Sequence, residues 1–253
     1  MLAHETYGEK GQPKLLLVHG LFGSGRNWRA IAKRLSSDFQ VTTVDMRNHA
    51  GSFWSDEMNY PAMAQDLEGV IERLGAPVMV MGHSMGGKAA MVLALSRPEL
   101  VERLIIADIA PVHYTHSHSH FIEAMQAMDL SQIQKRSDVG EALSQSVDEP
   151  ALRAFFAQSV EITPQGARWM LNLEVLKASM DDILSFPDVS GSYDKRTLFV
   201  GGAQSDYIND NAREIIKPLF PNARFAKLKN AGHWLHADQP KAFIQTLQVF
   251  CKA

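Results

Sequence analysis

The chain contains 253 residues, of which 45% are hydrophobic and 21% charged, and its formal net charge is −3. This length suits one large α/β domain or two small ones, and the slightly acidic balance argues against a nucleic-acid binder, which normally presents a basic face. A single cysteine (Cys251), no apolar run long enough to span a membrane and no secretion signal in residues 1–10 together predict a cytoplasmic protein.

Short apolar runs alternate with helical patterns through residues 1–110. Runs rich in Leu, Ile and Val are typical of strands that are buried on both faces of a parallel sheet. We predict such strands at 14–19, 40–44, 77–81 and 101–107. Apolar residues at helical spacing predict helices between them, at 28–35, 60–74 and 85–97.

This alternation stops between residues 111 and 187, where we find helical patterns and no convincing buried strand. The helices predicted there are 121–128, 140–146, 151–158 and 169–184. Alternation resumes with strands at 197–200 and 224–228 and helices at 211–219 and 240–251. The pattern predicts an α/β fold, a mostly parallel central sheet with helices on both faces. Residues 1–110 and 188–253 would form this core domain, and residues 111–187 a helical cap (lid) inserted before the strand at 197–200.

The segment Gly82-His83-Ser84-Met85-Gly86 follows a predicted strand and opens directly into a predicted helix. Gly-x-Ser-x-Gly in this context is typical of a nucleophile elbow, a tight turn that presents a serine at the end of a strand. The glycines leave room for neighbouring backbone that a Cβ would block. Ser84 is therefore a candidate nucleophile.

The same stretch also approaches the pattern of a phosphate-binding loop. Residues 82–89 come one residue short of G-x-x-x-x-G-K-[ST], and the apolar run that follows ends in Asp108, a potential magnesium ligand. Ala89 stands where the loop requires a hydroxyl, and this interpretation leaves Ser84 unexplained. A P-loop nucleotide hydrolase is therefore the remote alternative.

Four polar motifs follow predicted strands, which is where parallel α/β sheets bind ligands. They contain His19, Ser84, Asp206 and His233. The order Ser, Asp, His along the chain is the order of the α/β-hydrolase triad, and it differs from the orders of chymotrypsin-like and subtilisin-like proteases.

Five motifs give the sequence a resemblance to the α/β-hydrolase family over nearly its whole length. They are His-Gly-Leu-Phe-Gly-Ser at 19–24, Asp-Met-Arg-Asn-His at 45–49, Gly-His-Ser-Met-Gly-Gly at 82–87, Asp-Ile-Ala-Pro at 108–111 and Ala-Gly-His-Trp at 231–234. Together they resemble a YbfF-like subgroup of small cytoplasmic esterases. The resemblance implies a carboxylesterase or thioesterase that acts on acyl esters, acyl-CoA among them, without a cofactor.

The mechanism that goes with this resemblance assigns a role to each motif. Ser84 attacks an acyl carbonyl, His233 takes the proton of Ser84, and an aspartate orients the imidazole. The N–H groups of Leu21 and Met85 would hold the oxyanion. Water then hydrolyses the acyl-enzyme, with His233 as the base.

Two aspartates compete for the role of the acid. Asp206 follows the strand at 197–200, one strand before the histidine, where most acids of this fold lie. Asp108 follows the strand at 101–107, and its motif is shared with the resembling subgroup. We favour Asp206 and retain Asp108 as the alternative. Phe22 and Trp234 are expected to border the substrate pocket.

A histidine-rich turn lies at the entry to the predicted cap, with His113, His116, His118 and His120. Its spacing suits metal chelation, but only Glu123 accompanies it, so we predict no metal site. We expect a monomer or homodimer that acts on a small acyl ester or thioester. A cofactor-independent lyase of the menaquinone pathway, which uses the same triad, is the alternative within this fold.

Overall fold

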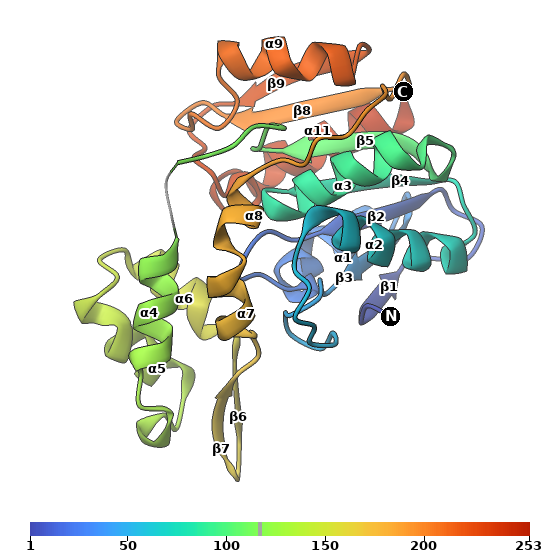
Figure 1. Ribbon diagram of the computed structural model, residues 1–253. Coiled ribbons are helices and arrows are strands. Elements are labelled where there is room, and N and C mark those ends of the chain that lie inside the picture. Colours follow the sequence, from blue (N-terminus) through green and yellow to red (C-terminus); the bar gives the residue numbers. More distant parts are fainter. Residues whose placement is uncertain (116–117) are drawn as a thin grey trace.

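The computed structural model describes residues 1–115 and 118–253, and its centre is a seven-stranded sheet (Figure 1). In spatial order the strands are β1 (His4–Tyr7), β3 (Gln40–Val44), β2 (Lys14–Val18), β4 (Val78–His83), β5 (Val101–Ala107), β8 (Thr197–Gly202) and β9 (Ala223–Leu228). Neighbouring strands are parallel except β1, which runs antiparallel to β3. The predicted mostly parallel sheet is confirmed.

Strand β1 is missing from the predicted strands because its sequence, His-Glu-Thr-Tyr, is polar. Its residues are largely exposed at the edge of the sheet, where they pair with β3. An edge strand with one solvated side carries no continuous apolar run, so hydrophobic patterning gives no signal for it.

The strands supply two hydrophobic cores because successive side chains point to opposite faces of the sheet. Leu16 and Val18 belong to the core under α2 (Tyr60–Leu74), α3 (Met85–Ser96) and α9 (Asp210–Leu219), whereas Leu15 and Leu17 face α1 (Arg29–Leu35) and α11 (Pro240–Lys252). Figure 1 shows these two helical layers on either side of the sheet. The short helices of this part are η1 (Gly25–Trp28), η2 (Pro98–Leu100) and α10 (Leu235–Asp238). Cys251 is buried in the second core, as expected of a packing residue.

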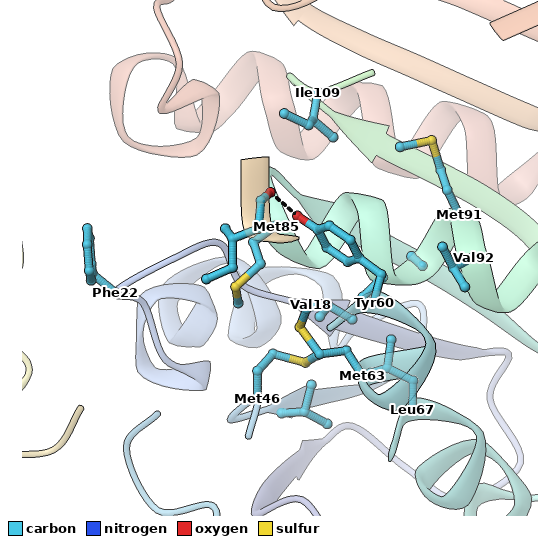
Figure 2. Close-up of a cluster of buried hydrophobic side chains, with 14 of the residues drawn as sticks. Val18, Phe22, Met46, Tyr60, Met63, Leu67, Met85, Met91, Val92 and Ile109 are labelled. Atoms are coloured by element: carbon cyan, nitrogen blue, oxygen red, sulfur yellow. Dashed lines mark hydrogen bonds between the residues drawn. The ribbon is translucent and has the colours of Figure 1, made fainter. Parts of the chain in front are cut away.

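A methionine-rich part of the first core lies beneath the start of α3. Figure 2 shows Met46, Met63 and Met85 in the same buried cluster as Tyr60. Methionine is flexible enough to fill irregular gaps between elements. Because Met85 directly follows Ser84, this core supports the turn that carries the candidate nucleophile.

Residues 111–187 connect β5 to β8 and are not entirely helical. Their helices are α4 (Ser119–Ala127), η3 (Leu130–Gln132), α5 (Arg136–Ala142), η4 (Leu143–Gln145), α6 (Pro150–Ala157), α7 (Leu173–Ala178) and α8 (Met180–Leu184). Between α6 and α7, β6 (Val160–Thr163) and β7 (Gly166–Trp169) form an antiparallel hairpin. This hairpin corrects the expectation of a wholly helical segment. The domain boundaries at 110 and 188 stay predictions.

The hairpin escapes prediction because both of its strands are short and half exposed. Gly166 adopts a φ of 126° at the turn, which only glycine reaches without strain. The predicted helix at 169–184 is in fact the end of β7 followed by two short helices that separate at Ser179. In the part of the chain that the structure describes, no helix is both long and apolar enough to cross a bilayer.

Candidate active site

Ser84 occupies the turn between β4 and α3, with a φ of 51° and a ψ of −121°. This backbone conformation is rare for a residue with a side chain and is held by close packing on both sides. A Cβ on Gly82 would lie 2.3 Å from Gly86 O, and a Cβ on Gly86 would lie 2.4 Å from His19 O. Both positions therefore require glycine, as expected of an elbow, and Ser84 is left half-buried at the carboxyl end of β4.

His233, in the loop after β9, forms a hydrogen bond with a carboxylate at the end of β5. Its Nδ1 donates to Asp108 Oδ2 at 2.8 Å. Asp108 is fully buried, and its carboxylate also accepts hydrogen bonds from Gly202 N–H at 2.9 Å and from the Ser205 hydroxyl at 2.5 Å. These three donors compensate for the cost of burying the carboxylate.

Our preference for Asp206 over Asp108 as the partner of His233 is therefore corrected. Asp206 is exposed, and the residue before it, Ser205, is the one that contacts the acid. The physical reason is that Asp108 N–H donates to Val200 O at 2.8 Å. The chain therefore continues alongside β8 for one residue beyond Ala107, the last residue of β5. The Asp108 carboxylate thus reaches the end of β8, the position expected for Asp206.

Two aromatic rings pack on the imidazole of His233, and one of them also holds its main chain. The ring of Tyr207 stacks on it at 4.2 Å between centroids, with 23° between the planes. The His83 ring lies 4.7 Å from it between centroids, and His83 Nε2 donates to the main-chain His233 O at 2.9 Å. Burial lowers the pKa of His83 well below its usual value, so this ring is neutral and carries its proton on Nε2.

The loop of Leu21, one of the two predicted oxyanion donors, is braced by two buried histidines. Phe22 has a φ of 63°, and its N–H donates to His49 Nε2 at 3.2 Å. The other nitrogen, His49 Nδ1, donates to Arg47 O at 2.8 Å. His19 has a similar role: its Nδ1 donates to Gly20 O at 2.8 Å, and its Nε2 accepts from the N–H of Met46, just after β3, at 2.9 Å.

Both bracing histidines are neutral. Burial lowers the pKa of His19 from 6.5 to about 4 and the pKa of His49 to about 3. A neutral imidazole has one donor and one acceptor nitrogen, which matches the two hydrogen bonds of each ring. The second predicted oxyanion donor, Met85 N–H, opens α3, where the first N–H groups have no carbonyl partner within the helix.

A cavity of about 140 Å³ brings most of the predicted site residues together. Ser84, His233, Leu21, Phe22 and Trp234 all line it. The 111–187 segment contributes three phenylalanine rings to the lining, those of Phe121, Phe155 and Phe156. A smaller cavity of about 30 Å³ adjoins Ser84, Met85 and Tyr207. The cavity lining is therefore mainly apolar and includes Ser84 and His233.

The histidine-rich turn does not form a metal site among the residues that the structure describes. No group of three His, Cys, Asp or Glu side chains suited to a metal ion occurs there. His118 lines the large cavity, and the His120 ring packs on Phe121 at 3.9 Å. His116 lies outside the described residues.

The nucleotide-hydrolase alternative conflicts with the position of Lys88. In a phosphate loop this side chain would point at the nucleotide, but Lys88 is 1% exposed and donates to three main-chain carbonyls. Ala89 is also fully buried. Neither residue can contact a phosphate group. The sequence does not predict the bonds of Lys88 to the 111–187 segment, of Ser205 to Asp108 or of His49 to Phe22, because each joins segments that are distant in the chain.

Comparison with known proteins gives a consistent picture. The model of the alpha/beta hydrolase family matches residues 15–246. The sn-1-specific diacylglycerol lipase ABHD11 of Mus musculus is 40% identical over 96% of this chain and 82% of its own length. Esterase YbfF of Escherichia coli (strain K12) is 33% identical over 97% of this chain and 96% of its own. A solved structure of a marine microorganism esterase has a TM-score of 0.94 and 38% identity, and covers 98% of both chains.

Proposed function

Because the chain belongs to the alpha/beta hydrolase family and is an ester-cleaving hydrolase, we propose that it cleaves its substrate with a catalytic triad of Ser84, His233 and Asp108. The observation that carries the proposal is the hydrogen bond from His233 Nδ1 to the buried Asp108 carboxylate, with Ser84 and His233 lining the same cavity. The substrate is a small acyl ester or thioester, which fits the apolar lining. No cofactor is required.

The first half of the reaction forms an acyl-enzyme. Ser84 Oγ attacks the acyl carbonyl carbon while His233 Nε2 takes the hydroxyl proton. Asp108 keeps the other imidazole proton on Nδ1 and stabilises the imidazolium that forms. The N–H groups of Leu21 and Met85 receive the oxyanion. His233 then gives its proton to the departing alkoxide or thiolate, and the bond from the acyl carbon to the leaving group breaks.

Hydrolysis of the acyl-enzyme repeats these steps with water. His233 Nε2 removes a proton from water as its oxygen attacks the ester carbonyl, and returns that proton to Ser84 Oγ as the carboxylic acid leaves. Ser205 supports the cycle because its hydroxyl donates to Asp108 Oδ2, the same oxygen that accepts from His233. Neutral His19 and His49 hold the oxyanion loop in place through Gly20 and Phe22.

A fluorophosphonate probe tests the proposed nucleophile, and a panel of substrates tests the activity. We expect stoichiometric labelling of Ser84, loss of labelling in Ser84→Ala and normal labelling in Ser192→Ala, which changes an exposed serine. The panel contains p-nitrophenyl esters and acyl-CoAs of graded acyl length, with a diacylglycerol because one relative is named for it. Hydrolysis that survives in Ser84→Ala would refute the proposal. The cytoplasmic location stays a prediction.

A further inference from the structure

Lys88 uses every hydrogen-bond donor of its ammonium group inside the protein. It lies one turn after Ser84 on α3 and is 1% exposed. Its Nζ donates to Val112 O at 2.9 Å, Leu184 O at 2.8 Å and Ser185 O at 2.6 Å. An ammonium has three N–H donors, and the neutral amine has only two, so this geometry suits the charged form.

The three carbonyls belong to both connections of the 111–187 segment. Val112 lies where the chain leaves the sheet, and Leu184 and Ser185 lie where it returns. The two connections also bond to each other, because Tyr114 N–H donates to Leu184 O at 3.0 Å. Lys88 therefore fastens the entrance and the exit of the segment to the helix that begins at the nucleophile.

Two tyrosines complete the surroundings of the cation. Lys88 Nζ lies 5.6 Å from the ring centroid of Tyr60 and 4.9 Å from that of Tyr114. Tyr60 adds a fastening of its own, since its hydroxyl donates to Ile183 O at 2.6 Å (Figure 2). Burial lowers the pKa of Lys88 from 10.5 to about 7, and the carbonyls and ring faces oppose this effect by favouring the charged form.

We propose that Lys88 is a positioning residue that sets how closely the 111–187 segment covers Ser84, and thereby the length of acyl chain that the cavity accepts. The proposal rests on the function given above. The supporting observation is that two parts of the chain line the cavity: the elbow with Ser84, and the segment with Phe121, Phe155 and Phe156. Lys88 fastens both ends of this segment to the helix that follows Ser84, so its loss would let the two parts of the lining separate.

The effect should depend on substrate length. A short acetyl group reaches only the floor of the cavity, whereas a long chain also contacts the rings of the segment. Lys88→Met keeps the length of the side chain and removes its donors. We expect its kcat/KM for p-nitrophenyl acetate to stay within about threefold of wild type, while KM for p-nitrophenyl octanoate rises about tenfold, the equivalent of two methylene groups losing their contacts.

A matched control exists at the opposite end of the sheet. Lys195 precedes β8, and its Nζ also donates to main-chain carbonyls, Pro98 O at 2.7 Å and Val101 O, at the first residue of β5, at 2.9 Å. Lys195→Met makes the same chemical change away from the cavity. We expect it to leave the ratio of octanoate to acetate kcat/KM unchanged.

The outcomes separate this proposal from the proposed function. If wild type is not labelled at Ser84 and does not hydrolyse acetate, the proposed function fails. If wild type is active but Lys88→Met keeps its acyl-length profile, or loses acetate and octanoate activity equally, the positioning role is wrong. Should Lys88→Met not fold, Tyr60→Phe weakens the same attachment at Ile183 and must raise the octanoate KM selectively, by about threefold. An unchanged profile in that variant overturns the proposal as well.

Discussion

His233 and Asp108 are 125 positions apart in the chain, and the 2.8 Å hydrogen bond between Nδ1 and Oδ2 joins the loop after β9 to the end of β5. One strand, β8, lies between β5 and β9. The proposed acid therefore reaches His233 across β8, and Ser205, which follows β8, donates to its carboxylate.

The position of the acid gives a direct test. Asp108→Asn keeps the shape of the side chain but removes the charge that orients and stabilises the imidazole, so we expect kcat to fall about 10⁴-fold. Asp206→Asn changes an exposed residue and should stay within about twofold of wild type. Steady-state kinetics on one p-nitrophenyl ester compare the two variants. The opposite ranking would return the role to Asp206.

Ser205 should affect turnover more than substrate binding. Ser205→Ala removes one of the three hydrogen bonds to the Asp108 carboxylate, and a hydrogen bond to a charged group is worth about 1.5–3 kcal/mol. We expect kcat to fall about tenfold or more at nearly constant KM, and Ser205→Thr to recover most of the loss. If the alanine and threonine variants are equally impaired, the hydroxyl is not the important group.

His49 offers a test of the oxyanion loop. In His49→Phe the Phe22 N–H loses its acceptor, and the loop that carries Leu21 N–H loses its support. We expect kcat to drop by about 10–100-fold with a smaller change in KM, because the donors act mainly on the transition state. His4→Phe, in the exposed edge strand β1, is the control and should leave kcat unchanged. Equal kcat values for the two variants would contradict the bracing role.

Two glycine substitutions should have opposite effects on stability. In Gly86→Ala the new Cβ meets His19 O at 2.4 Å, so the elbow must move, at a cost of about 1–3 kcal/mol in the free energy of unfolding. In Gly140→Ala, within α5, nothing lies within 4 Å of the new Cβ, and helix propensity predicts a gain of up to about 1 kcal/mol. Urea unfolding measures both. A neutral Gly86→Ala would show that the elbow is less tightly packed than described.

The buried histidines should make the fold sensitive to acid. Burial lowers the pKa of His19 and His236 to about 4 and of His49 to about 3, and it lowers the pKa of His83 well below 6.5. Between pH 6.5 and about 4 the unfolded chain binds protons that the folded chain does not, so the free energy of unfolding decreases as the pH falls.

The size of this effect can be counted in protons. At about pH 5.5, unfolding should take up on the order of three to four protons at the four histidines, which sets the slope of unfolding free energy against pH. Urea unfolding at several pH values measures that slope. His236→Phe should reduce the uptake by about one proton, and an unchanged slope in this variant would show that His236 titrates alike in both states.

Local patterns predict the buried strands and the elbow, because their signals lie within a few consecutive residues. The predicted strand at 101–107 matches β5, and the predicted helix at 60–74 matches α2. Ser84 and His233 come from short motifs at strand ends, and the structure brings both to one cavity. The family resemblance adds the fold, which the comparisons confirm.

The partner of His233 could not be decided in this way. Asp108 and Asp206 both follow predicted strands, and the difference between them arises from how β5 extends alongside β8, a relation between distant segments. The sequence also does not predict the contact of Ser205 with Asp108, since a serine after a strand suggests only a turn. The hairpin of β6 and β7 was missed because short, half-exposed strands resemble loops.

The hydrogen bond from Tyr114 N–H to Leu184 O joins the connection that follows β5 to the connection that leads to β8. Closing a loop of a different length across that hydrogen bond costs little extra, because closure entropy grows only slowly with length. The residues between Tyr114 and Leu184 can therefore be replaced by a stretch of different length at little cost in closure entropy. Evolution, or an engineer who grafts a new stretch here, can alter which acyl groups are accepted while Ser84, His233 and Asp108 stay where they are.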